Sequence, residues 1–130
     1  MPTCLIVSGN SGPQTIKKIA HKLPKSQFIE ILKNLGGTPD ELFDDDELFN
    51  FFEPVLRSDF KIAETHSLSN DKPIPVPIFA MMGSDEENSV EIENWRRYTN
   101  SNFKHKIFSG GHFFIYEHPY EIAKLIDANY

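Results

Sequence analysis

A chain of 130 residues with a net charge of −6 is long enough for one compact domain. Its acidic balance excludes the basic surface that a nucleic-acid-binding protein needs to neutralise phosphates. The single cysteine, Cys4, excludes an internal disulfide, and no apolar run approaches the length of a membrane span. Hydrophobic residues make up 39% of the chain, a globular composition. We therefore expect a cytoplasmic protein that binds neither nucleic acid nor membranes.

The first predicted strand is a short apolar run, residues 5–7, near the start of the chain. A run without alternation is typical of a strand that is buried on both faces, as in a parallel sheet. Ser11 follows it in a loop that looks like a nucleophile elbow, but the pattern G-x-S-x-G is not met because Pro13 occupies the last glycine position. A small hydrolase that uses Ser11 is therefore the weakest hypothesis.

A helical block is predicted next, over residues 23–66. Apolar residues spaced as on one helix face precede Gly36, which is expected to end the first helix. The acidic run 44–47 lacks the alternating ligands and central glycine of a calcium loop, so we interpret it as a solvated helix start. Pro54 is expected to break or restart the last helix. The block is too long for one crossover, which indicates an insertion covering one end of a sheet.

Strands and helices alternate in the rest of the chain. The apolar residues 78–82 predict a second strand, and residues 103–108 alternate as in a strand exposed on one side. Helices are predicted at residues 90–98 and 119–126. This order indicates an α/β fold with about three parallel strands, formed by residues 5–7, 78–82 and 104–108.

Three loops then fall at the carboxyl ends of the predicted strands, where ligands gather in open parallel sheets. They offer a serine, an acidic cluster and a histidine, in the chain order of α/β-hydrolases. His112 follows two glycines and is a candidate general base. The alternative is a structural histidine whose ring nitrogens form hydrogen bonds within the turn. Candidates to accept a hydrogen bond from its Nδ1–H are Asp85, Glu86 and Glu87. The alternative is that these three residues form an exposed acidic loop without such a role.

The other histidines have no predicted partners and are interpreted as structural or, for His118, as a surface residue. No cysteines and histidines have the spacing of metal ligands, so we expect no metal site.

Several stretches resemble type II thioesterases, which are α/β-hydrolases that serve nonribosomal peptide and polyketide synthases as editing enzymes. The most specific are Leu-Gly-Gly-Thr-Pro at residues 35–39 and Gly-Gly-His-Phe-Phe at residues 110–114. Others in the same order are residues 5–9, 23–28, 54–60 and 95–96. The resemblance implies that residues 1–130 correspond to the C-terminal portion of a thioesterase domain, with residues 23–66 as its helical lid.

The resemblance also implies roles for single residues. His112 matches the catalytic histidine, and the most direct alignment places Glu86 as the triad acid, whereas a shift of one residue would choose Asp85 or Glu87. In the family the nucleophilic serine lies in an earlier G-x-S-x-G elbow, which these residues do not contain. The implied reaction is hydrolysis of acyl thioesters on the phosphopantetheine arm of an acyl or peptidyl carrier protein, without a cofactor.

Two functional hypotheses follow. In the first, the chain is part of a thioesterase and is inactive alone, because the part with the nucleophile is supplied elsewhere or missing. In the second, it is a degenerate hydrolase fragment that serves as a binding or interaction module. In either case the apolar first strand has no covering element in the sequence, so we expect self-association through its edge.

Overall fold

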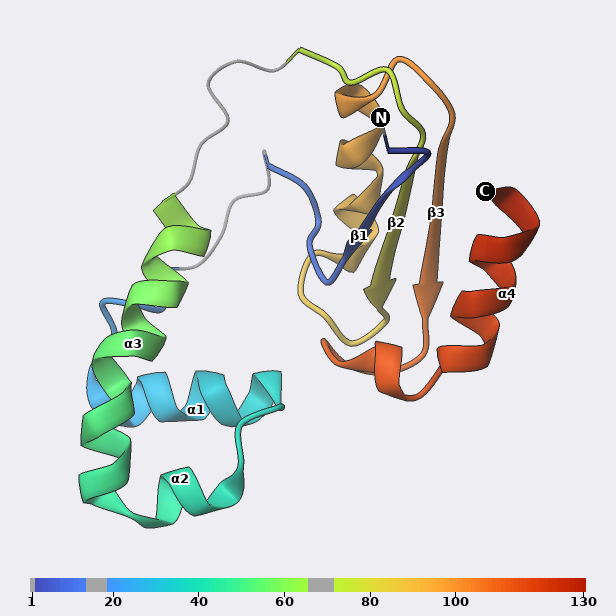
Figure 1. Ribbon diagram of the computed structural model, residues 1–130. Helices are drawn as coiled ribbons and strands as arrows, with labels where there is room; N and C mark the ends of the chain where they lie inside the picture. Colours follow the sequence, from blue (N-terminus) through green and yellow to red (C-terminus); the bar gives the residue numbers. More distant parts are fainter. Residues whose placement is uncertain (1, 14–18, 66–71) are drawn as a thin grey trace. The chain divides into compact units, whose positions relative to one another are not determined.

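The computed structural model describes residues 2–13, 19–65 and 72–130 (Figure 1). The chain divides into two compact units. One lies within residues 1–15 and 68–130 and holds the sheet, and the other lies within residues 16–67 and is helical. Within the described residues, no helix is long and apolar enough to cross a membrane.

The sheet contains three parallel strands in the order β1 (Leu5–Ser8), β2 (Ile78–Gly83) and β3 (Phe103–Phe108). Leu5 is in register with Ile78, and Ile78 with Phe103. These bounds agree closely with the strands predicted from the sequence, and the α/β class is confirmed.

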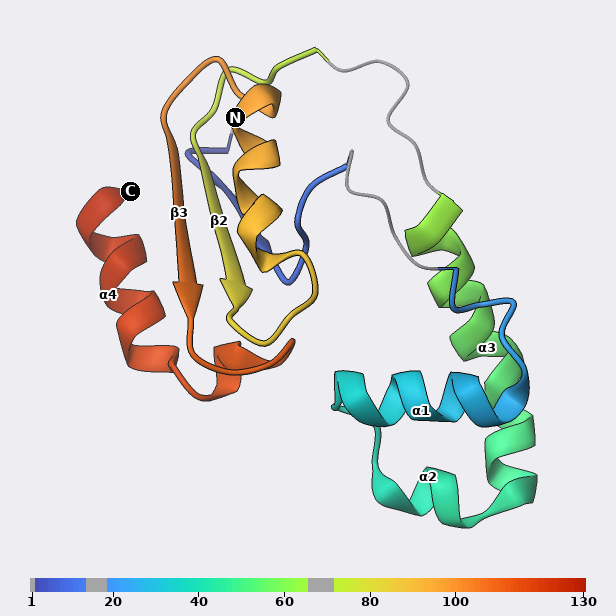
Figure 2. The same cartoon turned by 180° about the vertical axis from the view of Figure 1, so that it is seen from behind.

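The strand β2 is the centre of the fold, and all its residues are buried. On one face, Phe79 and Met81 pack with residues of the helix α4 (Pro119–Asn129). On the other face, Ala80 and Met82 pack against Ile92 of the 3-10 helix η1 (Ser89–Tyr98). Figures 1 and 2 show η1 against one side of the sheet and α4 beside β3. The unbroken apolar sequence of β2 therefore reflects burial on both faces, each large side chain contributing roughly 1.5–3 kcal/mol.

The strand β1 is less covered than its sequence predicts. It lies at an edge of the sheet, and the exposed fractions of Leu5 and Ile6 are 38% and 40%. Val7 of β1 packs against the cluster on one face of the sheet, and Cys4, which precedes β1, packs against the cluster on the other face. Burial on both faces, which the apolar pattern predicted, is therefore not found for β1, whereas the exposure of Leu5 and Ile6 agrees with the expectation that the sequence contains no element to cover this strand.

The helical unit contains α1 (Lys25–Leu35), α2 (Asp40–Asp44) and α3 (Asp46–Thr65). The helix α1 ends before Gly36, whose φ of 79° lies in the left-handed region that favours glycine. As predicted, the acidic run begins a helix: Asp45 Oδ1 accepts a hydrogen bond from the Leu48 amide at 3.0 Å. Phe28, Leu32 and Phe49 form the buried core of this unit.

The expected break at Pro54 does not occur, since α3 continues through it to Thr65. A proline inside a helix costs roughly 3 kcal/mol. Phe49 lies before Pro54, and Leu56 and Phe60 lie after it, and all three pack into the same core. Because burial of each such side chain contributes roughly 1.5–3 kcal/mol, packing on both sides of the proline outweighs its cost.

Candidate active site

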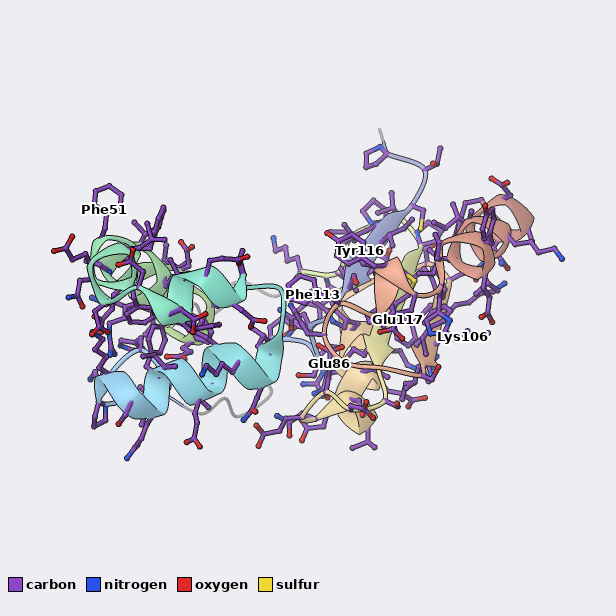
Figure 3. All side chains as sticks on the ribbon, turned by 90° about the horizontal axis from the view of Figure 1, so that it is seen from below. Phe51, Glu86, Lys106, Phe113, Tyr116 and Glu117 are labelled. Carbon is purple, nitrogen blue, oxygen red and sulfur yellow. The ribbon has the colours of Figure 1, made fainter. Side chains whose placement is uncertain are left out.

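The loops that follow the three strands meet at one end of the sheet, which Figure 3 views from below. The Ser84 amide donates to Phe108 O at 2.7 Å, and the Asp85 amide donates to Gly110 O at 3.0 Å. Gly83 makes this approach possible, because a Cβ there would overlap the carbonyl oxygens of Gly110 and Gly111. The acidic loop and the histidine loop are therefore fixed to each other by main-chain contacts.

His112 and Glu86 form a hydrogen-bonded pair across these two loops. The imidazole Nδ1 lies 2.6 Å from Glu86 Oε1. A carboxylate only accepts hydrogen bonds, so Nδ1 carries the proton and donates it, and Nε2 is the nitrogen that is free to accept one in the neutral ring. The exposed fraction of the His112 side chain is 32%, whereas that of Glu86 is 8%. The pair thus combines a buried carboxylate with a partly open imidazole.

Glu86 is held by its own loop as well as by the histidine. Its second oxygen, Oε2, accepts a hydrogen bond from the Gly83 amide at 2.7 Å, and its own amide donates to Gly83 O at 3.2 Å. Both carboxylate oxygens therefore have donors, which fixes the carboxylate at the end of β2 (Figure 3).

The hydrogen bond to Glu86 raises the pKa of His112 above its ordinary value. Burial of the ring opposes this shift, and the negative charge of Glu86 adds to it. The arrangement therefore stabilises the imidazolium form, which is what a general base requires after it has taken a proton.

The imidazole lies over the start of the loop that follows β1. A Cβ added to Gly9 would lie 2.6 Å from His112 Cε1 and 3.5 Å from Glu86 Oε1. The Gly9 amide donates to Met81 O at 2.9 Å, which continues the β1–β2 pairing to this residue. The histidine supplied after β3 thus reaches across β2 to the end of β1.

Aromatic residues hold the chain that follows the histidine. Phe114 is fully buried and stacks on Phe108, with 5.4 Å between ring centroids. Its amide donates to Gly111 O at 3.1 Å and begins the 3-10 helix η2 (Phe114–Tyr116). Phe113 packs edge-to-face with the His112 ring at 5.0 Å. The Gly-Gly-His-Phe-Phe element is therefore a turn with one buried anchor that projects the histidine.

The other candidate residues lie elsewhere. The Asp85 carboxylate accepts a hydrogen bond from Ser84 Oγ at 3.1 Å, on the exposed side of the loop. Ser11 is buried, and among the described residues no hydrogen bond joins its hydroxyl to His112. The loop of Ser11 is instead attached to η1, because Trp95 Nε1 donates to Asn10 O at 2.7 Å. Of the chemical groups singled out from the sequence, the structure brings together His112 and Glu86.

Sequence reasoning missed partners for three other histidines. His21 bonds the Glu64 carboxylate, His105 Nε2 lies 3.2 Å from Glu93 Oε1, and His118 Nε2 lies 2.8 Å from Ser109 O. His66 lies outside the described residues. None of these pairs has a local sequence signal, since each joins elements that only the fold brings together. No cluster of three or more potential metal ligands occurs among the described side chains.

Comparison with known proteins gives one consistent family. The sequence profile of the family described as "Thioesterase domain" matches residues 1–130. The gramicidin S biosynthesis protein GrsT of Aneurinibacillus migulanus is 36% identical over 129 residues, which cover 96% of this chain and 50% of that protein. The thioesterase PikA5 of Streptomyces venezuelae is 33% identical over 125 residues, which cover 94% of this chain and 44% of that protein. The chain thus spans about half the length of these curated relatives.

Solved structures that resemble the chain include members of the same family. The type II thioesterase BorB from the borrelidin biosynthetic cluster superposes with a TM-score of 0.78 at 31% identity, over 97% of this chain and 53% of that one. The type II thioesterase YbtT from the Yersiniabactin NRPS/PKS pathway superposes with a TM-score of 0.81 at 26% identity, over 96% of this chain and 53% of that one. These matches confirm the α/β-hydrolase fold class and the resemblance to type II thioesterases that the sequence motifs predicted.

Proposed function

The chain belongs to the thioesterase domain family, and on that premise we propose that it supplies the histidine and the acid of a serine-hydrolase site for acyl thioesters. His112 is the general base, and Glu86 is the acid that orients it. The observation that carries the proposal is the 2.6 Å contact between His112 Nδ1 and Glu86 Oε1, beside a partly exposed ring.

In the proposed reaction, Nε2 of His112 accepts the proton of a serine hydroxyl as the serine oxygen attacks the thioester carbonyl. Glu86 keeps Nδ1 protonated, so the neutral ring offers its lone pair at Nε2, and its negative charge stabilises the imidazolium that forms. The proton then passes to the departing thiolate, and a water molecule activated by the same histidine hydrolyses the acyl-enzyme. A glutamate is compatible with this role, because the triad acid of α/β-hydrolases is an aspartate or a glutamate.

The serine is not among these 130 residues in the form the family uses, because the sequence contains no G-x-S-x-G. Ser11 is a poor substitute, being buried and unconnected to His112 by any hydrogen bond within the described part of the chain. We therefore propose that the chain alone does not hydrolyse thioesters, and that a serine-bearing part of the same fold completes the site.

The proposed substrate is an acyl or peptidyl group on the phosphopantetheine of a carrier protein. Support comes from the relatives, one of which is a gramicidin S biosynthesis protein and another a thioesterase of an NRPS/PKS pathway. The helical unit, with α1, α2 and α3, is proposed as the lid over the acyl group. No cofactor is required, since nucleophilic attack and proton transfer suffice.

A second candidate is a non-catalytic interaction module, which is favoured by the missing serine motif. The two candidates predict different outcomes when the site is completed. In the experiment, the chain is joined to the part of the gramicidin S relative that it does not match. Hydrolysis of an acylated carrier protein is then measured from the amount of acid released.

The catalytic proposal expects no turnover by the chain alone and turnover by the joined protein that is lost on His112→Ala. The matched control is His105→Ala, in β3 but bonded to Glu93 and not to Glu86. A joined protein that is folded, binds the carrier protein and remains inactive would favour the interaction module instead.

A further inference from the structure

Hydrogen bonds to main-chain carbonyl groups hold the turn that leads from β3 to His112. Backbone amides of the loop after β2 donate to two of these carbonyls, Phe108 O and Gly110 O. An amide of η2 donates to a third, at 3.1 Å. The carbonyl of Ser109 has a donor of a different kind, the imidazole Nε2 of His118, at 2.8 Å and nine residues further along the chain. The side chain of His118 therefore closes the segment that displays the candidate base.

The contact defines which nitrogen of His118 carries a proton. A carbonyl oxygen only accepts hydrogen bonds, so Nε2 is protonated and donates to Ser109 O. The Ser109 hydroxyl lies 3.3 Å from the same nitrogen. Nδ1 lies 3.9 Å from Glu121 Oε2, which is beyond the length of a hydrogen bond. His118 is therefore a donor through Nε2, whereas His112 carries its proton on Nδ1 and offers Nε2 as a base.

The ring of His118 is itself held in place. Its side chain is 21% exposed, and its centroid lies 5.2 Å from that of Phe108, the ring that also stacks on Phe114. The His118 amide donates to Phe114 O at 3.2 Å, and the Ile122 amide donates to His118 O at 3.0 Å as α4 begins. Figure 1 shows α4 beside β3, so the donor is carried on an element that packs against the sheet.

Two glycines make the turn dependent on such contacts. Glycine has more conformational freedom than any other residue, and Gly110 has a φ of 120°, in the region that favours glycine. A turn of this kind holds the next side chain in one place only when neighbouring groups are bonded. The distance that has to be kept is the 2.6 Å between His112 Nδ1 and Glu86 Oε1. A misplacement of about 1 Å in a catalytic group can cost roughly 10²-fold in rate.

We infer that His118 is a positioning residue for His112: its Nε2–H, bonded to Ser109 O, holds the Gly-Gly turn so that His112 stays paired with Glu86. The inference rests on the proposed function for the role of His112 in catalysis. The tether itself is a property of the 130-residue chain and is testable there without turnover. His118 acts only through His112 and exchanges no proton with the substrate.

Two substitutions separate the hydrogen bond from the ring. His118→Gln keeps an N–H donor at about the position of Nε2 and removes the ring. His118→Phe keeps a ring beside Phe108 and removes the donor. The matched control is Tyr120→Ala in the first turn of α4, where the tyrosine is 90% exposed. Circular dichroism establishes that each variant is folded.

The first measurement is an NMR titration of the His112 ring in the 130-residue chain. The hydrogen bond to Glu86 raises the pKa of His112, so a loosened turn in His118→Phe should bring that pKa down towards its ordinary value. The pKa should be unchanged in His118→Gln and in Tyr120→Ala. In the protein completed with a serine-bearing part, His118→Phe should reduce kcat roughly 10–100-fold with KM unchanged, and His118→Gln should retain most of the activity.

Two results would overturn the inference. One is a His112 titration that is the same in the natural chain and in folded His118→Phe. The other is a greater loss in His118→Gln than in His118→Phe, which would make the ring the important part. Should His118→Phe not fold, the titration of His118→Gln decides alone, because a lowered His112 pKa there contradicts the tether. A completed protein without turnover would contradict the proposed function, whereas the titration would still decide the role of His118.

Discussion

Gly9 leaves the space that the imidazole of His112 occupies. A Cβ at position 9 would lie 2.6 Å from His112 Cε1 and 2.9 Å from Nδ1, closer than real contacts of a Cβ. The φ of Gly9, 66°, is also in the left-handed region, which disfavours residues with a Cβ. The loop after β1 therefore shapes the candidate site through the absence of a side chain, although it contributes no reacting group.

Gly9→Ala should displace the His112 ring and destabilise the protein. The left-handed backbone alone costs roughly 1–2 kcal/mol for a residue with a Cβ, and the overlap with the ring adds to that. The His112 Cε1–H resonance should shift in NMR spectra, and urea unfolding should measure the loss. The control is Gly111→Ala, where an added Cβ meets no atom within 4 Å and φ is not positive. If both variants behaved alike, the close approach at Gly9 would not matter to the pair.

Glu86→Gln should lower the pKa of His112. The variant replaces the charged acceptor by a neutral amide oxygen, so the charge and the charge-assisted hydrogen bond that raise this pKa are lost, and the burial that lowers it remains. An NMR titration of the His112 ring protons in the 130-residue chain measures the change directly. The control is Asp85→Asn, because Asp85 bonds Ser84. A larger fall in Asp85→Asn than in Glu86→Gln would move the acid by one residue.

The same pair should make stability depend on pH in a defined direction. A histidine whose pKa is raised on folding contributes stability that is fully present below its unfolded value of about 6.5 and is lost as pH rises through the folded value. The difference in unfolding free energy between the natural chain and Glu86→Gln should therefore decrease as pH rises through that interval. Urea unfolding at several pH values tests this, and a difference that grows with pH would contradict the assigned shift.

Most of the sheet could be predicted from the sequence, because apolar runs between turn residues mark buried parallel strands. Residues 78–82 and 103–108 are clear examples, and both became strands with nearly the predicted bounds. His112 was also a candidate from local sequence, since two glycines after a strand project the next side chain. The burial of β1 was not predictable in the same way, because it depends on which elements lie beside the strand.

Other features depend on contacts that the sequence does not encode locally. The choice of Glu86 rather than Asp85 beside His112 follows from the turn in which the Gly83 amide bonds Glu86 Oε2. The pairing of His21 with Glu64 joins residues far apart in the chain. The continuation of α3 through Pro54 also depends on tertiary packing, which outweighs the local tendency of proline to end a helix.

Glu64 should be important for the stability of the helical unit. Its carboxylate accepts hydrogen bonds from the amides of Ala20 at 2.8 Å and His21 at 3.3 Å and pairs with the His21 ring, and it is 7% exposed. Glu64→Ala leaves these donors buried without an acceptor, which should cost about 3 kcal/mol. Circular dichroism during urea unfolding measures the loss. Glu30→Ala, on the exposed side of α1, should change stability by less than about 0.5 kcal/mol. Equal effects at both positions would contradict the role of Glu64.

The most direct test of the account compares kcat of three variants in the protein completed with a serine-bearing part. His112→Ala should reduce kcat by roughly 10⁶-fold, because the serine loses its base. Glu86→Gln should cost more than Asp85→Asn, since Glu86 Oε1 is the atom bonded to Nδ1. If His112→Ala left kcat unchanged, or if Asp85→Asn were the more damaging of the two acid variants, the His112–Glu86 pair would not be the catalytic pair.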